Sequence, residues 1–232
     1  GQTFDTDWQK EVLRMKAFQH DHSLSLTGAT NLSSYYFSLG YTNQEGVARP
    51  NSMERFTVRT NLDQRETKWL TIGTNIGLTQ TVYHGLNSMH GALSGNIFSA
   101  IRQHPNVPVY NPSHSTGYNI DVNPLIVGRW NNLETVSDNL PNIIYVLDHN
   151  VFYSNVLRVI GNFYIQANIL PSLNFKTQLS TDVAKTDGLL YYDPIHGDGA
   201  SSNGRVENSL NNNTRWNIQN ILTYKETFGD EH

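Results

Sequence analysis

The stretch LTIGTNIGL, residues 70–78, alternates apolar and polar residues for longer than most soluble strands do. Successive side chains on a β-strand point to opposite faces, so Leu70, Ile72, Ile76 and Leu78 share one face. The other face carries threonine, asparagine and glycine, which are small and hydrophilic. A soluble sandwich covers such an apolar face with a second sheet, whereas a membrane barrel turns it to lipid and keeps the polar face for a watery lumen.

The composition narrows the choice of protein class. The chain has 232 residues, of which 38% are hydrophobic and 16% charged, a net charge of -4 and no cysteine. The mean hydropathy of -0.47 and the lack of any apolar run near about 18 residues exclude a spanning helix, but the strands of a membrane barrel are only half apolar and remain possible. A mildly acidic chain offers no electrostatic footprint for nucleic acid. A chain without cysteine has no disulfide scaffold.

Several other stretches repeat the period of two, and turn residues separate them. The pattern predicts an all-β fold, an antiparallel up-and-down sheet of about seven strands. The predicted strands lie near residues 22–28, 33–43, 54–63, 68–82, 155–169, 172–186 and 213–227.

The connections between these strands alternate between short and long, and the two long loops are predicted at 84–154 and 188–212. Strict alternation places every tight turn at one end of the sheet. Outer-membrane barrels have this arrangement, with short periplasmic turns and long extracellular loops. A soluble meander with one elaborated end fits the pattern as well. Seven strands do not close a barrel of the usual even number, so the chain is either part of something larger or an open sheet.

Two helices are predicted outside the strands. The first lies within residues 1–20, where Thr6 and Gln9 fit a capping box and Trp8, Val12 and Met15 fall on one stripe. The second covers residues 92–103, inside the first long loop, and carries an apolar stripe that needs cover.

If the sheet is a membrane barrel, its apolar side chains face lipid, because the opposite side chains are too polar for hydrocarbon. Aromatic residues near strand ends, Trp69, Trp216 and Tyr224, suit an interfacial girdle. The residues predicted to face lipid are Leu70, Ile72, Ile76, Leu78, Phe163, Ile165, Phe175 and Leu179.

Motifs for metal binding and catalysis are weak or missing. The histidines of the first long loop, His84, His90, His104 and His114, lack the spacing of metal ligands and are better read as exposed loop residues. Asp193 and Asp198, with nearby glycines, hint at a calcium loop without the order of an EF-hand. The sequence contains neither G-x-S-x-G nor a phosphate-cradling glycine loop. We therefore predict no enzyme, no metal site and no cofactor.

Three aromatic residues of the first long loop are the best candidates for contact with a substrate. Aromatic faces stack on sugars and pack against peptides, which makes Tyr110, Tyr118 and Trp130 candidate binding residues. The alternative is that each of them packs the loop against itself or against a partner.

Several motifs resemble the SusC/RagA family of TonB-linked outer-membrane proteins of Bacteroidetes. They are TDWQ at 6–9, LSLTG at 24–28, YYFSLGY at 35–41, QEG at 44–46, FTVRTNL at 56–62 with Arg59 and Asn61, and WL at 69–70 followed by Gly73. Residues 105–112, 116–117 and 123–124 look like the family's first large extracellular loop. The resemblance covers nearly the whole chain and is strongest over residues 6–80.

The resemblance implies a fragment of a longer transporter. Residues 1–20 would be a plug-to-barrel linker, and residues 21–232 about seven early strands of a 22-stranded transmembrane β-barrel in the bacterial outer membrane. It also implies a SusD-like surface lipoprotein as lid, a TonB-ExbB-ExbD complex as motor, and an oligosaccharide or oligopeptide cargo. The alternative from another class is a soluble β-rich surface glycan-binding module.

Overall fold

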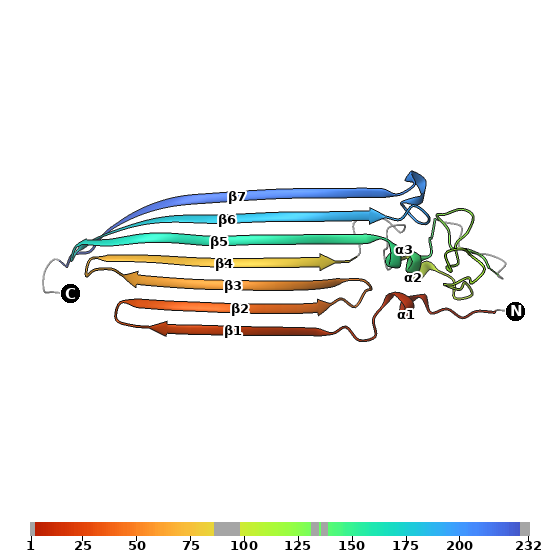
Figure 1. Ribbon diagram of the computed structural model, residues 1–232, viewed down its shortest axis with the longest axis horizontal. Coiled ribbons are helices and arrows are strands. Elements are labelled where there is room, and N and C mark those ends of the chain that lie inside the picture. The colour runs from red at the N-terminus through yellow and green to blue at the C-terminus, as the bar shows by residue number, and fades with distance from the viewer. Residues whose placement is uncertain (1–2, 86–97, 131–134, 136–138, 228–232) are drawn as a thin grey trace.

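The computed structural model describes residues 3–85, 98–130, 135 and 139–227. Within them the chain forms one antiparallel sheet whose spatial order follows the sequence from β1 to β7 (Figure 1). This confirms the predicted all-β, up-and-down arrangement of seven strands. The strands are β1 (Gln19–Ala29), β2 (Ser33–Glu45), β3 (Ser52–Arg65), β4 (Leu70–His84), β5 (Val151–Leu170), β6 (Leu173–Tyr192) and β7 (Arg205–Tyr224).

Three short turns lie at one end of the sheet, which we call the turn end. Side-chain hydroxyls shape two of them: Thr30 Oγ1 accepts hydrogen bonds from the amides of Leu32 and Ser33, at 3.2 and 3.0 Å. Thr67 Oγ1 accepts from the amide of Leu70, at 3.0 Å, in the same way. Such local bonds let threonine replace backbone partners in a tight turn. The longer connections lie at the opposite end, the loop end (Figure 1): 46–51, the described parts of 85–150, and 193–204.

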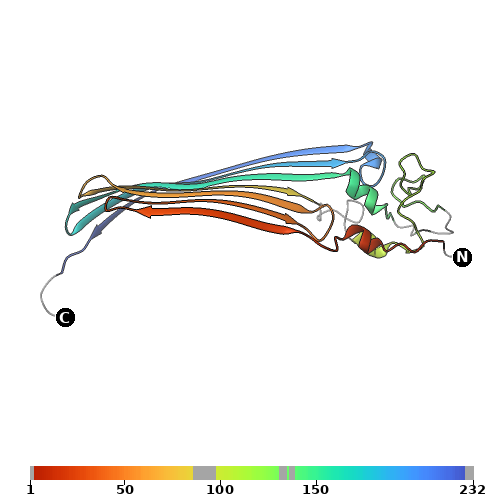
Figure 2. The same ribbon diagram turned by 60° about the horizontal axis from the view of Figure 1, so that its bottom comes forward.

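The strand register gathers most of the large apolar side chains on one face of the sheet. Ile72 pairs with Ile165, and Phe163 with Leu179, which in turn pairs with Ile218. We call the side that carries them the apolar face, and all eight residues predicted to face lipid lie on it. Many of its side chains are open to solvent, among them Leu24 at 70% and Leu222 at 65% exposure. The sheet is therefore a single layer without a second sheet over this face among the described residues (Figure 2).

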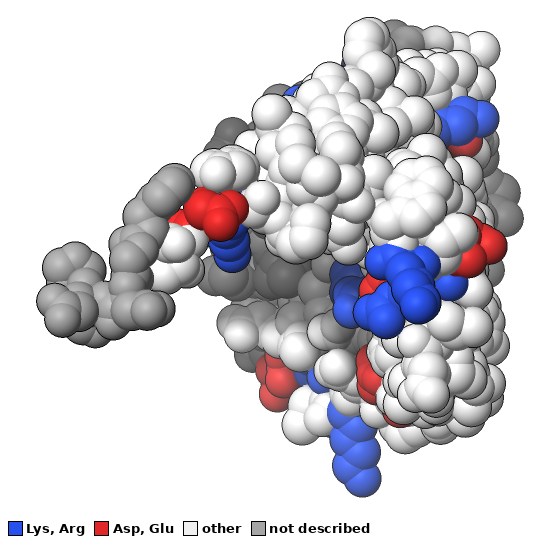
Figure 3. Space-filling model, turned by 90° about the vertical axis from the view of Figure 1, so that its left-hand side faces the viewer, with Lys and Arg blue, Asp and Glu red and all other residues white. Residues whose placement is uncertain are grey.

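The polar face is the opposite side of the same sheet. One row across it reads Asn61, Asn75, Asn162, Ser180 and Asn217 from β3 to β7. An amide-to-amide hydrogen bond of 3.1 Å joins Asn75 to Asn162. Viewed from the turn end, the charged side chains form small groups between larger uncharged areas (Figure 3).

The second long loop is shorter than predicted, and the predicted boundaries 188–212 are wrong. β6 continues to Tyr192 and β7 starts at Arg205, which leaves 193–204 as the connection. Beyond Val183 the apolar face carries Lys185 and Asp187, so the apolar–polar alternation fades while the backbone ladder continues. The first long loop also ends earlier than predicted, because β5 begins at Val151. β5, β6 and β7 have 20 residues each, about twice what a tilted strand needs to cross a bilayer.

Among the described residues, three short α-helices lie at the loop end. In α1 (Trp8–Val12) the N-cap is Asp7, whose side chain accepts a hydrogen bond from the amide of Lys10. The predicted capping box on Thr6 is therefore wrong, because the helix begins one residue later; Met15, 81% exposed, does not join the buried stripe. Part of the predicted helix 92–103 lies outside the described residues, and α2 covers Phe98–Arg102. α3 (Ile143–His149) was not predicted.

These helices and their loops form a small packed unit at the loop end. We call residues 3–18, 98–130, 139–150 and 193–204 the loop lobe. Its buried core contains Trp8, Val107, Val127, Ile143 and Val146 among others. The N-terminal segment joins this core: the indole Nε1 of Trp8 donates to the carbonyl of His104, at 3.1 Å. Residues 1–20 as a plug-to-barrel linker remain a prediction. No helix among the described residues is long and apolar enough to cross a membrane.

Candidate functional site

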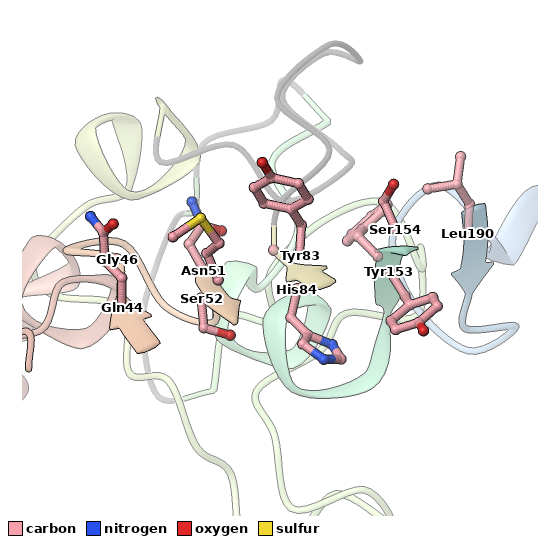
Figure 4. Close-up of a pocket in the computed structure, with 12 residues that line it drawn as sticks. Gln44, Gly46, Asn51, Ser52, Tyr83, His84, Tyr153, Ser154 and Leu190 are labelled. Atoms are coloured by element: carbon pink, nitrogen blue, oxygen red, sulfur yellow. The ribbon is translucent and has the colours of Figure 1, made fainter. Parts of the chain in front are cut away.

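A recess opens on the polar face where the sheet meets the loop lobe. Its volume is about 570 Å³, and strands β2 to β6 contribute to its lining. Figure 4 shows that Tyr83 and His84, neighbours on β4, point to opposite sides, with Tyr83 and Ser154 on the side of the recess. The residues that line it are Gln44, Gly46, Asn51, Ser52, Met53, Tyr83, His84, Gly85, Phe152, Tyr153, Ser154 and Leu190.

The recess combines aromatic and aliphatic surface with a few amides and hydroxyls. Phe152 and Leu190 are paired across β5 and β6, and both lie on the polar face. Gln44, Asn51 and Ser154 add hydrogen-bonding groups at the rim. A mostly apolar hollow of this size with a few polar groups is the usual form of a small-molecule or peptide side-chain site. The arrangement is suited to binding and contains no nucleophile paired with a base.

Sequence reasoning missed this recess. Its signal was present, because Tyr83, Phe152 and Leu190 interrupt the polar face at positions where alternation calls for hydrophilic residues. Those interruptions lie on three strands, and only the register shows that they are near one another.

A hydrogen-bond network holds the loop lobe together, with Asn142 at its centre. The Asn142 side-chain nitrogen donates to the carbonyl oxygens of Val109, at 2.6 Å, and Asn119, at 3.2 Å. Its side-chain oxygen accepts from the amide of Tyr145 and so caps α3. One buried asparagine thereby joins two segments of the loop to the start of a helix.

His196 connects the two long loops. Its ring is fully buried, and its Nε2 accepts a hydrogen bond of 2.7 Å from the backbone amide of Asn142. An acceptor nitrogen carries no proton, so the ring is neutral in this arrangement. Burial, together with the nearby His114, lowers the pKa of His196 to about 4.

Tyr145 and Asp193 form the second link between these loops. The Tyr145 hydroxyl donates to Asp193 Oδ1 at 2.8 Å, and the same oxygen accepts from the amide of Ile195, at 2.8 Å. The Asp193 amide donates to the side chain of Asn150, at 2.8 Å. Burial, together with the hydrogen bond to Asp193, raises the pKa of Tyr145. The tyrosine therefore stays neutral at physiological pH and remains a donor.

The three predicted aromatic residues do not converge on one site. Tyr118 contacts the ring of Tyr110 at 5.3 Å and donates from its hydroxyl to Asp148 at 2.8 Å. Burial and that bond raise the pKa of Tyr118. Trp130 lies elsewhere, with its ring 5.5 Å from that of Phe4. Tyr110, at 51% exposure, is more open to a partner than Tyr118, and substrate contact by any of the three remains a prediction.

The histidines and the weak calcium motif have other contacts. His84 packs against Tyr153 at 5.3 Å, and His114 Nδ1 shares a hydrogen bond with the hydroxyl of Thr116. His90 lies outside the described residues. Within the part of the chain that the structure describes, no group of three His, Cys, Asp or Glu is placed to hold a metal ion. The absence of metals and cofactors stays a prediction.

Comparison with known proteins shows similarity to TonB-dependent receptors over nearly the whole chain. TonB-dependent receptors P3 and P26 of Formosa agariphila are 26% and 27% identical over 97% and 98% of this chain. TonB-dependent receptor SusC of Bacteroides thetaiotaomicron is 38% identical over 60 residues, which are 26% of this chain and 6% of that protein. A solved structure of the RagAB peptide importer in the 'closed-closed' state has a TM-score of 0.71, with 21% identity over 98% of this chain and 24% of that one. No protein-family model matches the sequence.

The chain is similar over nearly its whole length to TonB-dependent receptors, and over a shorter stretch to SusC. The chain spans about a fifth of the length of receptors P3 and P26, since the aligned part makes up 21% of each. The similarity to the SusC/RagA family confirms the resemblance seen in the motifs. The structural neighbours are RagA barrels, and they confirm the barrel-type fold of the sheet.

Proposed function

We propose that this chain is part of the barrel wall of an outer-membrane TonB-dependent transporter that imports oligosaccharides or oligopeptides. The observation that carries the proposal is the two-sided sheet: most of its large apolar side chains share one face, and its asparagine-rich face is opposite. Lipid on one side and an aqueous lumen on the other satisfy both faces. The apolar face then includes the eight predicted lipid contacts.

The orientation in the membrane follows from the connections. Short turns of outer-membrane barrels are periplasmic and long loops extracellular. We therefore assign the turn end to the periplasm and the loop lobe to the cell exterior. The long ladders of β5, β6 and β7 extend beyond the bilayer and carry the lobe away from its surface.

The proposed partners follow from the family. A SusD-like lipoprotein would cover the loop end, and a TonB-ExbB-ExbD complex would supply energy from the inner membrane. The solved relatives are states of a peptide importer, RagAB, which supports an importer with oligopeptide or oligosaccharide cargo. The recess beside Tyr83 lies on the proposed lumenal face below the lobe, where arriving cargo would first meet the wall.

The experiment that tests this proposal uses the full-length protein in its own membrane. We expect it to fractionate with the outer membrane and to need detergent for extraction. We also expect cells without the gene to lose uptake of one class of labelled oligosaccharide or oligopeptide, and the restored gene to return it. A full-length product that is soluble without detergent would instead favour the surface glycan-binding module.

A further inference from the structure

A second hollow lies on the polar face, nearer the turn end than the recess beside Tyr83, and has arginines on two sides. Small side chains of β4, Gly77, Thr79 and Thr81, form its floor. β3 and β5 flank that strand and supply the walls, in a groove of about 370 Å³. The arginines that line it are Arg55, Arg59 and Arg158.

The register explains why these arginines surround one floor. Arg59 pairs with Gly77 and Arg55 with Thr81, both across β3 and β4. Arg158 pairs with Thr79 from the other side, on β5. Each arginine therefore stands beside a residue too small to fill the space above β4, and the groove stays open between them.

Acidic groups balance only part of this positive charge. Asp182 holds Arg158 in a two-pronged pair, with Nε to Oδ1 at 3.0 Å and Nη2 to Oδ2 at 2.8 Å. Asp182 also pairs across β6 and β7 with Arg215. Asp182 therefore lies beside two arginines, Arg158 of the groove and Arg215 of β7. A guanidinium does not lose its proton in proteins, so the excess charge persists at every physiological pH.

The remaining contacts among the described residues leave Arg55 and Arg59 available. Arg55 Nη2 lies 3.3 Å from the sulfur of Met53, a weak acceptor. Arg59 is exposed. Asp21 shares the row of Arg55 but stands two strands away, where it accepts a hydrogen bond from Thr42.

The groove lies directly behind the apolar face. Val58 and Leu78, neighbours of its lining residues in sequence, pair with each other on that face. In the proposed barrel the groove is therefore inside the lumen at membrane depth. Several arginines in a confined aqueous channel concentrate anions, and their planar forks match carboxylate and sulfate groups.

We propose that this groove binds carboxylate or sulfate groups of an anionic oligomeric cargo as it passes along the inner wall. The proposal rests on the proposed transport function and specifies its substrate class. The charge complementarity favours the cargo, and the acidic side chains of a protein segment inside the barrel are the competing occupant.

The test measures binding to the purified full-length protein in detergent, with tetragalacturonate, tetraglutamate, a sulfated carrageenan tetrasaccharide and neutral maltotetraose as probes. We expect the R55Q/R59Q variant to bind the preferred anionic probe roughly tenfold more weakly or worse, since a hydrogen bond to a charged group contributes about 1.5–3 kcal/mol. The affinity of this variant for the probe should also depend less steeply on salt concentration than that of the wild-type protein. R65Q is the matched control, because Arg65 lies on the same face of β3 at its turn end, and it should change neither value.

The outcomes distinguish between the possible anionic groups and between cargo and a protein segment as the occupant of the groove. A preference for one anionic probe identifies uronate, peptide carboxylate or sulfate as the source. The inference is overturned if no anionic probe binds the wild-type protein, or if R55Q/R59Q binds them unchanged. It is also overturned if the variant keeps its affinity but lets vancomycin leak into cells, which would show that the arginines hold a segment inside the barrel. Binding that persists in a protein without uptake activity would contradict the transport proposal alone.

Discussion

The contacts that hold the sheet together differ in kind from those that hold the loop lobe together. In the sheet, each strand pairs with its sequence neighbour, and short turns or loops set most pairings. In the lobe, the decisive contacts join residues far apart, such as Asn142 and His196, which are 54 positions apart. The sheet leaves large apolar side chains uncovered, whereas the lobe buries Trp8, Val127 and Ile143 almost completely. The proposed membrane setting accounts for this difference, with lipid against the apolar face of the sheet and water around the lobe.

Among the variants that test this difference, replacement of Trp8 should have the largest effect on stability. Trp8 is 3% exposed in the lobe core, so Trp8→Ala should destabilise the lobe by about 3–5 kcal/mol. The full-length protein should still insert, because the sheet does not depend on this contact. Limited proteolysis of the lobe and heat-modifiable gel mobility of the barrel measure the two effects. Loss of insertion together with lobe cleavage would contradict the separation.

A charge on the apolar face should have the next largest effect. Ile76→Arg should cost roughly 2–4 kcal/mol if the residue lies near the bilayer midplane. Asn75→Arg, one position away, places the same charge on the polar face and should have a mild effect. Urea unfolding of the full-length protein in lipid vesicles measures both. Equal losses at the two positions would reject the membrane orientation.

Acidification should loosen the lobe and leave the sheet intact. The pKa of His196 is lowered from its ordinary value of 6.5 to about 4, so the neutral ring supports the fold fully above pH 6.5. As the pH falls from 6.5 to 4, the unfolded lobe takes up a proton that the folded lobe excludes. The loss should reach about 3 kcal/mol near pH 4, since each pKa unit corresponds to about 1.4 kcal/mol.

Protease cleavage within residues 193–204, followed from pH 7.5 to 4, measures this loss. His196→Gln should remove most of the pH dependence between 6.5 and 4 and supplies the control. Cleavage that depends equally on pH in both proteins would assign the effect to another group.

Removal of one hydroxyl should have the smallest effect. Tyr145→Phe deletes the bond to Asp193 but leaves that carboxylate its bond from Ile195, so the lobe should lose about 1–2 kcal/mol. Tyr110→Phe is the control, because Tyr110 is half exposed and should change lobe stability little. Proteolysis rates at pH 7.5 compare the two variants. A larger effect at Tyr110 would contradict the assigned network.

The sequence was informative where structure depends on local pattern. Alternation along 70–78 predicted both the strand and the face of each side chain, because a strand's geometry fixes which residues share a face. The ends of β6 and β7 escaped prediction, since Lys185 and Asp187 remove the contrast between faces while backbone pairing continues. The signal for α3 was ambiguous, because its IIYVLDH sequence is buried around much of its surface and a short apolar run fits a strand equally well.

The candidate site was less predictable than the fold. Two hollows, the recess beside Tyr83 and the arginine groove, each consist of residues from several strands. Those strands are far apart in the sequence, so the sequence alone does not show that the residues are close in space. Arg59 and Arg158 come together only through the pairing of β4 with both neighbours. Register is a tertiary property that no single segment encodes.

The alternating environment of β4 is the central claim, and spin labels test it most directly. Nitroxides are placed one at a time at positions 70–79 of the full-length protein in lipid vesicles, and their accessibility to oxygen and to a water-soluble nickel complex is measured. Labels at Leu70, Ile72, Ile76 and Leu78 should favour oxygen, and labels at Thr71, Gly73, Asn75 and Gly77 the nickel complex, with a period of two. Accessibility to the nickel complex at every position, without alternation, would contradict the account.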